Sequence, residues 1–292
     1  MSDPLHIQPF FHDASGTWTY VVSRGRDAVI IDPVLDYDAK SGRLGSDSID
    51  AVLAHVRERG LAVHRVLETH AHADHLSAAQ VARAQTGAPV GIGAGISQVQ
   101  AHFARVFGID ADAAELREAF DARFRDGETI EAGSLRFTAM ASPGHTSDSL
   151  AYVIDGNVFV GDTVFAPDVG TARCDFPGGS IDALYDTIQR FHAMPDDTVL
   201  WLCHDYPPQG RERRASVPVG ESRRENRMLD GSTSRQQFRE RRSARDAALP
   251  APNLLYPSLQ VNIRGGRLPP FEANGRRYLR TPLANSDLPG IA

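Results

Sequence analysis

The chain has 292 residues, of which 41% are hydrophobic and 23% are charged, and its formal net charge at pH 7 is −6. A chain of this length and composition can bury about 75% of its unfolded surface, which excludes a largely disordered protein. The negative charge argues against nucleic acid as the general partner.

The sequence also has the features of a protein that stays in a reducing compartment and outside the membrane. The first ten residues include Asp3, Pro4 and Pro9 where a signal peptide needs an apolar run, and no apolar stretch is long enough to span a bilayer. Two cysteines, Cys174 and Cys203, are too few for a disulfide framework. We therefore expect a cytoplasmic protein with no membrane contact.

The first predicted elements are a β-hairpin and a helix. Residues 17–22 and 28–31 are rich in strand-forming residues and flank a glycine-containing loop. The polar stretch 36–47 is expected to be an exposed loop. Ser48 is expected to cap a helix that ends at Gly60, because apolar residues then follow at helical spacing.

A histidine-rich motif follows the next predicted strand. Residues 63–68 have the pattern of a buried strand and residues 76–86 that of a helix docked by one face. Between them lies Thr69-His70-Ala71-His72-Ala73-Asp74-His75. If these side chains were buried without a metal, each unpaired polar group would cost about 1 to 3 kcal/mol. We therefore predict a metal site at this turn rather than a surface loop that is rich in histidine.

Three further ligand candidates come at the ends of later predicted strands. Residues 89–93 are expected to form a strand and residues 97–118 a helical excursion. Three segments then lead to candidate ligands: the strand 135–140 to His145, the hairpin 150–154 and 158–160 to Asp162, and the strand 199–202, which follows a helix capped by Ser180, to His204.

The composition changes after residue 208. Residues 211–245 contain eleven arginines and five acidic residues, whereas Lys40 is the only lysine of the chain. This segment is predicted to form a pair of helices that face water, with a rim that attracts an anionic substrate as the alternative. We assign residues 1–208 to a catalytic core, and residues 209–292 to an arginine-rich helical segment with a final strand and tail that complete the same domain.

Hairpins that alternate with strand-helix units predict an α+β fold in which two mixed β-sheets pack together and helices cover them, an αββα sandwich. The ordered set of ligand candidates resembles that of the metallo-β-lactamase superfamily, and the resemblance implies the same fold. It also implies a dinuclear option, in which two Zn(II) ions hydrolyse an ester, thioester or lactone. Its ligands would be His70, His72 and His145 on one ion, Asp74, His75 and His204 on the other, and Asp162 between them.

The competing option uses a single Fe(II) held by His70, His145 and Asp162, which leaves positions open for substrate and dioxygen. His72, Asp74, His75 and His204 would then orient these ligands or bind a second metal. Spacing alone does not separate the two options, because the same side chains serve both.

A closer resemblance favours iron. Several segments are similar to the persulfide dioxygenases related to the ethylmalonic encephalopathy protein, above all to the bacterial branch labelled β-lactamase-hydrolase-like. They are residues 16–20, 28–35, 69–75, 141–146, 161–162, 173–176 and 204–206. The resemblance implies one iron per chain that oxidises glutathione persulfide, or a similar small persulfide, with O2 to sulfite and thiol in sulfide detoxification. The alternative is a dinuclear zinc hydrolase of the glyoxalase II or lactonase kind.

Two side chains outside the metal motif are candidates for contact with substrate. Arg173 follows the Asp162 strand and is predicted to bind a substrate carboxylate, with a structural ion pair to Asp175 as the alternative. Tyr206 follows His204 and is predicted to direct its hydroxyl towards bound oxygen or sulfur, with core packing as the alternative. Cys174 is expected to be incidental to catalysis. Homodimerisation is an expectation from the family alone.

Overall fold

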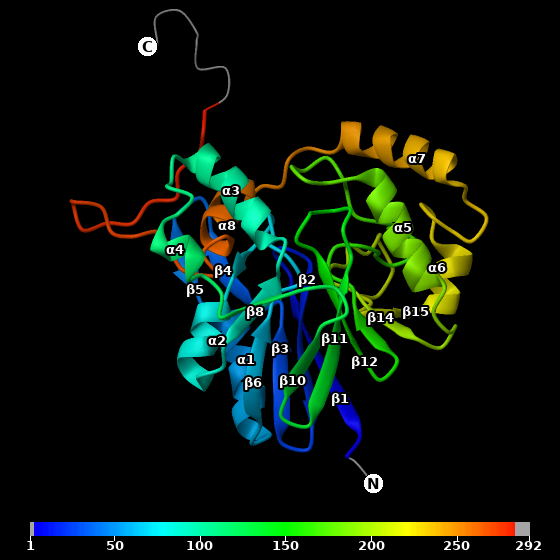
Figure 1. Ribbon diagram of the computed structural model, residues 1–292, viewed down its shortest axis with the longest axis horizontal. Helices are drawn as coiled ribbons and strands as arrows, with labels where there is room; N and C mark the ends of the chain where they lie inside the picture. Colours follow the sequence, from blue (N-terminus) through cyan, green and yellow to red (C-terminus); the bar gives the residue numbers. More distant parts are fainter. Residues whose placement is uncertain (1–2, 284–292) are drawn as a thin grey trace, which may run out of the picture.

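The computed structural model describes residues 3–283 (Figure 1). Two six-stranded sheets pack face to face around a shared core, and helices cover their outer faces. Figure 1 shows α1 and α2 beside one sheet and α5, α6 and α7 beside the other. This confirms the predicted αββα sandwich.

The first sheet is mixed and has the order β1-β2-β3-β6-β8-β9. Its first three strands are antiparallel, and the last three run parallel to β3. The strand bounds are β1 (Leu5–His12), β2 (Thr17–Arg24), β3 (Asp27–Ile31), β6 (Ala62–Leu67), β8 (Val90–Gly93) and β9 (Ala122–Phe124). The predicted opening hairpin is β2 and β3, and β1 is an edge strand that sequence patterns did not indicate.

The second sheet has the order β10-β11-β12-β13-β14-β15, and only the β13–β14 pair is parallel. The bounds are β10 (Thr129–Ala132), β11 (Leu135–Ala141), β12 (Leu150–Ile154), β13 (Asn157–Phe159), β14 (Val199–Trp201) and β15 (Ser216–Pro218). The β12–β13 hairpin confirms the prediction, since Asp155 and Gly156 have the positive φ angles (45° and 72°) of a tight two-residue turn.

The helices divide between the two outer faces. On the first sheet lie α1 (Asp47–Glu58), α2 (Ala79–Thr86), α3 (Ile96–Phe107), α4 (Ala114–Arg117) and α8 (Leu255–Asn262). The second sheet is covered by α5 (Ile181–His192) and α6 (Val219–Glu225), and α7 (Arg235–Ala248) packs against α5. Ser180 caps α5 as predicted, because its side chain accepts a hydrogen bond from the Ala183 backbone.

The structure corrects the N-terminal predictions in two places. The stretch 36–47 is not simply a loop, since β4 (Val34–Asp38) and β5 (Arg43–Gly45) form a small sheet with β7 (Leu76–Ser77). Ser48 is not the cap of α1, because the helix begins at Asp47 and Ser46 occupies the N-cap position. Ser48 instead donates its backbone N–H and its hydroxyl to the Asp36 carboxylate, at 2.9 and 2.7 Å.

Two helical assignments also change. The excursion 97–118 is two helices, since Gly108 ends α3 in the left-handed conformation at φ 64°. The apolar run 254–263, predicted as a final strand, is the helix α8, in which Pro257 occupies the first turn, where proline is tolerated. Short apolar runs that are buried all round do not distinguish strand from helix.

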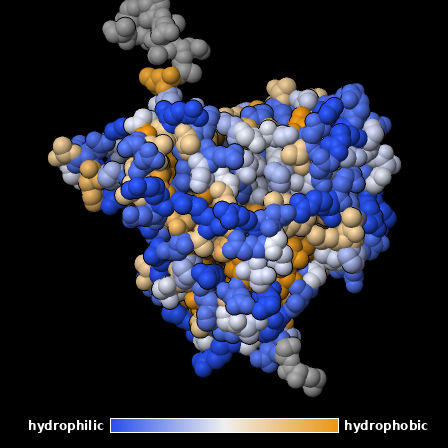
Figure 2. All heavy atoms as spheres, viewed as in Figure 1, coloured by the Kyte–Doolittle hydropathy of each residue, from blue (hydrophilic) through white to orange (hydrophobic). Residues whose placement is uncertain are grey.

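The α8 helix packs into the core of the first half of the chain, next to α3 and β7. The surface shown in Figure 2 is largely hydrophilic, with apolar residues in smaller patches. No helix between residues 3 and 283 combines the length and the apolar character that crossing a bilayer requires.

Candidate metal centre

The ligand candidates come from loops that follow strands of both sheets. His70 to His75 follow β6 in the first sheet, whereas His145, Asp162 and His204 follow β11, β13 and β14 in the second. Backbone hydrogen bonds join these loops across the sheets: Leu150 donates to Thr69 at 2.8 Å, and Trp18 donates to Cys203 at 2.7 Å. The fold therefore brings residues that are far apart in the sequence to one edge of the sandwich.

His70, His145 and Asp162 form one group of potential ligands, and all three are buried. The Asp162 carboxylate lies 4.0 Å from His70 Nε2 and 3.7 Å from His145 Nε2. Two atoms that are each about 2.1 Å from a shared ion lie about 3 to 4 Å apart, so these separations fit one bound metal.

His72, Asp74, His75 and His204 form a second group. The Asp74 carboxylate lies 3.4 Å from His204 Nε2 and 3.4 Å from His75 Nδ1. Asp162 connects the two groups, because its other oxygen, Oδ1, lies 3.2 Å from His204 Nε2. All seven residues of the predicted set are thus brought together, and their division between one and two ions stays a prediction.

Unpaired atoms support a metal at this edge. Several fully buried polar atoms of the ligand candidates have no hydrogen-bond partner between residues 3 and 283: His70 Nε2, His72 Nδ1, Asp74 Oδ2, His75 Nε2, Asp162 Oδ1 and His204 Nε2. Each would carry a desolvation cost of about 1 to 3 kcal/mol if nothing bound it. Nitrogen and carboxylate donors of this kind suit zinc or iron, so the residues present fit a metal ion.

In His70 and His145, the ring nitrogen that does not face the other ligands already makes a hydrogen bond. His145 Nδ1 donates to the Arg173 carbonyl oxygen at 2.8 Å, which leaves Nε2 with a free lone pair. His70 Nδ1 donates to the Thr69 hydroxyl at 3.0 Å, and that hydroxyl donates to Asp32. Such bonds fix the tautomer and the ring orientation of metal-binding histidines.

His72 is held by two buried carboxylates. Its Nε2 lies 3.1 Å from Asp32 Oδ1 and 3.4 Å from Glu68 Oε2, so Nδ1 is the nitrogen that faces the other ligands. Burial alone would lower the pKa of His72, but the neighbouring negative charge of Asp32 raises it well above the usual value. Asp32 also accepts the Thr69 backbone N–H at 2.7 Å, and it therefore anchors the start of the motif.

In contrast to His72, His70 and His75 have lowered pKa values that keep their rings neutral. Burial, followed by the neighbouring imidazole of His72, lowers the pKa of His75 to about 4 and lowers that of His70 well below its usual value. A neutral imidazole keeps the lone pair that a metal needs.

Asn262 ties the C-terminal helix to the metal motif. Its side-chain amide donates to the carbonyl oxygens of His72 and His75 at 2.7 and 2.8 Å, and its oxygen accepts the Ser77 backbone N–H at 2.8 Å. The Ser77 hydroxyl in turn donates to Glu68. A residue of α8 therefore fixes a loop that lies almost two hundred positions earlier in the chain.

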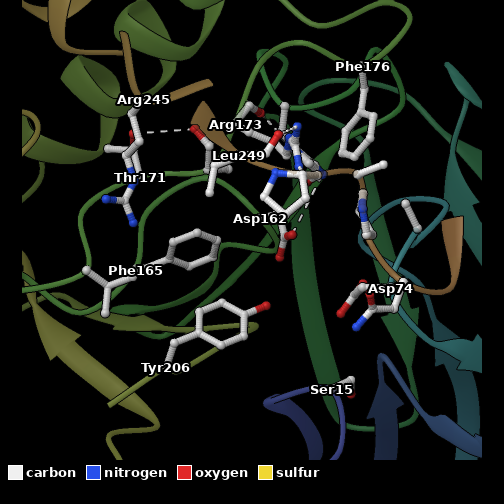
Figure 3. A pocket seen from close by; sticks show the side chains of 18 of the residues that line it. Ser15, Asp74, Asp162, Phe165, Thr171, Arg173, Phe176, Tyr206, Arg245 and Leu249 are labelled. Atoms are coloured by element: carbon white, nitrogen blue, oxygen red, sulfur yellow. Dashed lines mark hydrogen bonds and ion pairs between the residues drawn. The ribbon is translucent and has the colours of Figure 1, made fainter. Parts of the chain in front are cut away.

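A cavity of about 670 Å³ opens onto the metal ligands (Figure 3). His145, Asp162 and Asp74 contribute to its wall. Figure 3 shows Asp162 in the middle, with Asp74 on one side and Arg245 on the other. A space of this size accepts a ligand larger than an inorganic sulfur anion.

Tyr206 lines this cavity and stacks on a candidate ligand. Its ring is nearly parallel to that of His204, with centroids 5.5 Å apart, and it meets the edge of Phe165. Gly16 makes room for the ring: at φ 68°, a Cβ there would lie 2.9 Å from a Tyr206 ring carbon. Packing around the hydroxyl, followed by the charges of Asp74 and Asp162, raises the pKa of Tyr206, so the phenol stays protonated.

Arg173 also lines the cavity, but its guanidinium is occupied. It binds Asp175 through two hydrogen bonds of 2.6 and 2.7 Å and donates to the Pro250 carbonyl oxygen at 2.6 Å. The structural ion pair that was the alternative prediction is therefore present, and a contact of Arg173 with substrate stays a prediction. Cys174 is buried, and burial raises the pKa of its thiol to about 12, which disfavours sulfur exchange.

Sequence reasoning missed the buried residues that hold the ligands, namely Asp32, Glu68, Thr17 and Asn262. Thr17 lies 3.4 Å from His75 and 3.3 Å from His204 through its hydroxyl. The only available signal was a charged or polar residue next to a strongly apolar strand, as at Asp32 and Glu68.

Comparisons with known proteins agree with this geometry. The family profile of the metallo-beta-lactamase superfamily matches residues 12–204. The chain is 45% identical over 279 residues to a "Beta-lactamase hydrolase-like protein" of Xylella fastidiosa, an alignment that covers 95% of this chain. The chain spans 64% of the length of that relative.

Other similar proteins have names from two enzyme classes. "Glyoxylase B2" of Dictyostelium discoideum is 38% identical over 281 residues, with 96% of each chain covered. Human "Persulfide dioxygenase ETHE1, mitochondrial" is 27% identical over 208 residues, which cover 70% of this chain and 69% of that protein. The crystal structure of ETHE1 from Myxococcus xanthus aligns with a TM-score of 0.71 at 29% identity, covering 90% of this chain and all of that one.

Proposed function

The chain belongs to the metallo-beta-lactamase superfamily, and from that premise we propose that it is a non-haem iron persulfide dioxygenase. The proposed reaction takes glutathione persulfide or a similar small persulfide, one O2 and one water, and yields the thiol, sulfite and protons. The outer persulfide sulfur is oxidised, O2 is reduced, and the S–S bond breaks with the electron pair passing to the thiol.

The observation that carries the proposal is the buried group of two histidines and one carboxylate beside the cavity. His70, His145 and Asp162 form a set of potential ligands without help from the other four residues, and His145 and Asp162 face the cavity. Two histidines and one carboxylate are the usual ligands of oxygen-activating iron. The similarity to ETHE1 proteins in sequence and in structure supports the same choice.

Bound Fe(II) would supply the redox chemistry and the vacant positions at which sulfur and dioxygen meet. The chain's own residues would hold the ion, and Thr69 and the Arg173 carbonyl oxygen fix the rings of His70 and His145. The rings of Phe165, Phe176 and Tyr206 line the cavity beside them and give it an apolar wall. The protonated Tyr206 hydroxyl can donate a hydrogen bond to an anionic ligand in this space.

The second candidate function is a dinuclear zinc hydrolase that cleaves a thioester or lactone. The position of Asp162 favours it, because one of its oxygens lies near His70 and His145 and the other lies 3.2 Å from His204. Such a carboxylate can bridge two ions. The similarity to "Glyoxylase B2" supports this candidate as well.

Paired activity assays on one preparation test the choice. Protein loaded with iron under anaerobic conditions should consume O2 with glutathione persulfide and release one sulfite per O2. The same protein should not cleave S-lactoylglutathione, the thioester that a glyoxalase II hydrolyses. Thioester cleavage with no O2 uptake would overturn the dioxygenase and establish the hydrolase.

A further inference from the structure

The arginine-rich segment 211–245 is mostly neutralised by ion pairs. Seven of its eleven arginines contact a carboxylate of the chain, and their partners come from several elements, including α5. They are Arg211, Arg213, Arg214, Arg223, Arg235, Arg239 and Arg242. The segment therefore closes the fold with charge pairs rather than presenting eleven free cations to solvent.

Arg245 and Arg227 differ from these seven, since both line the cavity and neither pairs with a carboxylate of residues 3–283. Arg227 donates to the Asp168 carbonyl oxygen at 3.1 Å. The guanidinium of Arg245, on the last turn of α7, has no hydrogen-bond partner within the described part of the chain. Arg245 is half-buried.

Two carboxylates that could neutralise Arg245, its sequence neighbour Asp246 and the cavity residue Asp168, are already engaged. Asp246 accepts from Arg242 at 2.9 Å through one oxygen and from the Cys174 backbone at 3.1 Å through the other. Asp168 accepts from Arg211 at 2.6 Å. Burial, followed by the positive charges of Arg242 and Arg227, lowers the pKa of Arg245, and Asp246 only partly opposes this. A half-buried cation among like charges is stabilised when an anion binds beside it.

We propose that Arg245, assisted by Arg227, binds a carboxylate of the thiol that carries the persulfide. This inference rests on the proposed function and names its substrate class: a carboxylate-bearing thiol persulfide rather than a neutral one or inorganic polysulfide. Arg245 and Asp74 lie on opposite sides of Asp162 in Figure 3, so an elongated substrate can place its carboxylate at the arginine and its sulfur near His145 and Asp162. Arginine suits this task because its planar fork matches a carboxylate.

The assignment differs from the one that the sequence favoured. Arg173 was predicted to bind the substrate carboxylate, but its donors are already used by Asp175 and by the carbonyl oxygens of the segment 249–250. Arg245 reaches the same cavity from α7, and its guanidinium donors are free of contacts with the described residues. The alternative prediction assigned an anion-attracting rim to the segment 211–245. The present proposal limits that rim to Arg245 and Arg227.

Binding measurements that do not depend on turnover test the inference. Titration calorimetry would compare S-methylglutathione with its diethyl ester, which has the same skeleton without carboxylate charge. In Arg245→Gln, the dissociation constant of the acid should rise about tenfold or more, while that of the ester changes by less than about twofold. In oxygen-uptake assays, Arg245→Gln should raise KM for glutathione persulfide and leave kcat nearly unchanged, as expected for a uniform binding contact.

Arg224→Gln is the matched control, because Arg224 is exposed on α6, does not line the cavity and makes no ion pair within the described residues. It should bind both ligands like the unmodified protein. Equal weakening of acid and ester in Arg245→Gln, or no weakening of the acid, would overturn the inference. If the unmodified protein bound the acid through Arg245 but consumed no O2 with any persulfide, the carboxylate site would stand and the dioxygenase would fall.

Discussion

Two polar regions of this molecule differ in how many of their polar groups find a partner within the chain. The metal edge is the edge of the sandwich where the seven ligand candidates meet. Six of these residues each have one fully buried nitrogen or oxygen atom without a hydrogen-bond partner among residues 3–283. In the segment 211–245, seven of eleven arginines are bound to carboxylates. The polar groups of the first region need a ligand as their partner, whereas most of those in the second region have partners within the chain.

The difference separates binding groups from structural groups. Charge alone is a poor guide, because seven of the eleven arginines in the segment 211–245 form ion pairs within the chain. An unpaired polar atom in a buried or cavity position is a better guide, since leaving it unpaired is costly. By this criterion we group Arg245 with the metal-ligand candidates as part of the proposed substrate site, whereas the Arg173 guanidinium already binds Asp175 and the Pro250 carbonyl oxygen.

The largest expected effect comes from removing a ligand of the metal edge. Asp162→Ala should release the iron and lower activity by more than the about 100-fold that loss of an outer hydrogen-bond partner costs. Asp74→Ala should retain some iron, because Asp74 is outside the His70 group. Metal analysis after gel filtration, with oxygen-uptake assays, measures both.

Asp168→Ala is the control for this pair, since Asp168 lines the cavity but binds Arg211 and no metal-ligand candidate. It should keep its iron. If Asp162→Ala and Asp74→Ala lost all metal to the same extent, the single-ion assignment would be wrong.

A smaller effect should follow when the support of the metal edge is removed. Asn262→Ala leaves the carbonyl oxygens of His72 and His75 and the N–H of Ser77 without their partner. We expect a loss of about 2 to 4 kcal/mol in unfolding free energy and about tenfold weaker metal binding. Denaturant unfolding and metal titration measure these changes. The exposed Asn274, changed to Ala, should show neither. Unchanged metal affinity in Asn262→Ala would mean that α8 does not position the motif.

His192 is a buried histidine of α5 that offers a test outside the two regions compared above. Burial, followed by the charge of Arg223, lowers its pKa to about 4, while its ring contacts Ser222 at 3.1 Å. Because the unfolded chain binds this proton from about pH 6.5 and the folded chain does not, stability should fall as pH drops from 7 to 5. His192 should contribute about 2 kcal/mol to this loss of unfolding free energy.

Urea unfolding at the two pH values should therefore show a steeper loss in the unmodified protein than in His192→Gln. The same slope in both proteins would show that His192 is not held neutral by the fold.

The smallest effect is expected within the ion pairs themselves. Arg173→Ala should destabilise the protein by about 1 kcal/mol, since its pair with Asp175 is partly exposed. If Arg173 acts by holding the segment 249–250, Asp175→Asn should change KM for glutathione persulfide in the same direction as Arg173→Ala. A rise of KM in Arg173→Ala alone would return Arg173 to the substrate site.

The contrast between the two regions also explains what the sequence revealed. His70, His72, Asp74 and His75 were found because ligands that share a turn leave a local pattern. His145, Asp162 and His204 were found because each follows a strand. Asn262 was not, since its role depends on α8 packing beside a loop far away in the sequence, which no local pattern encodes.

The sequence predicted the layers of the fold and its two main hairpins, but it did not predict several short elements. The pattern of β12 and β13 was clear because alternating strands meet at a tight turn. The short strands β4 and β5 and the helix α8 were not recognised, because their few residues carry too little periodicity to identify the element. Likewise, Arg245 is one arginine among eleven in its segment. Only the structure distinguishes it, because it lines the cavity and its guanidinium has no hydrogen-bond partner among residues 3–283.

The central claim is a single redox-active ion held by His70, His145 and Asp162. Anaerobic titration of metal-free protein with Fe(II), followed by persulfide-dependent oxygen uptake at each point, tests it most directly. The account predicts that activity rises linearly and stops at one iron per chain. Activity that required two ions per chain, or that appeared with zinc and without oxygen, would contradict it.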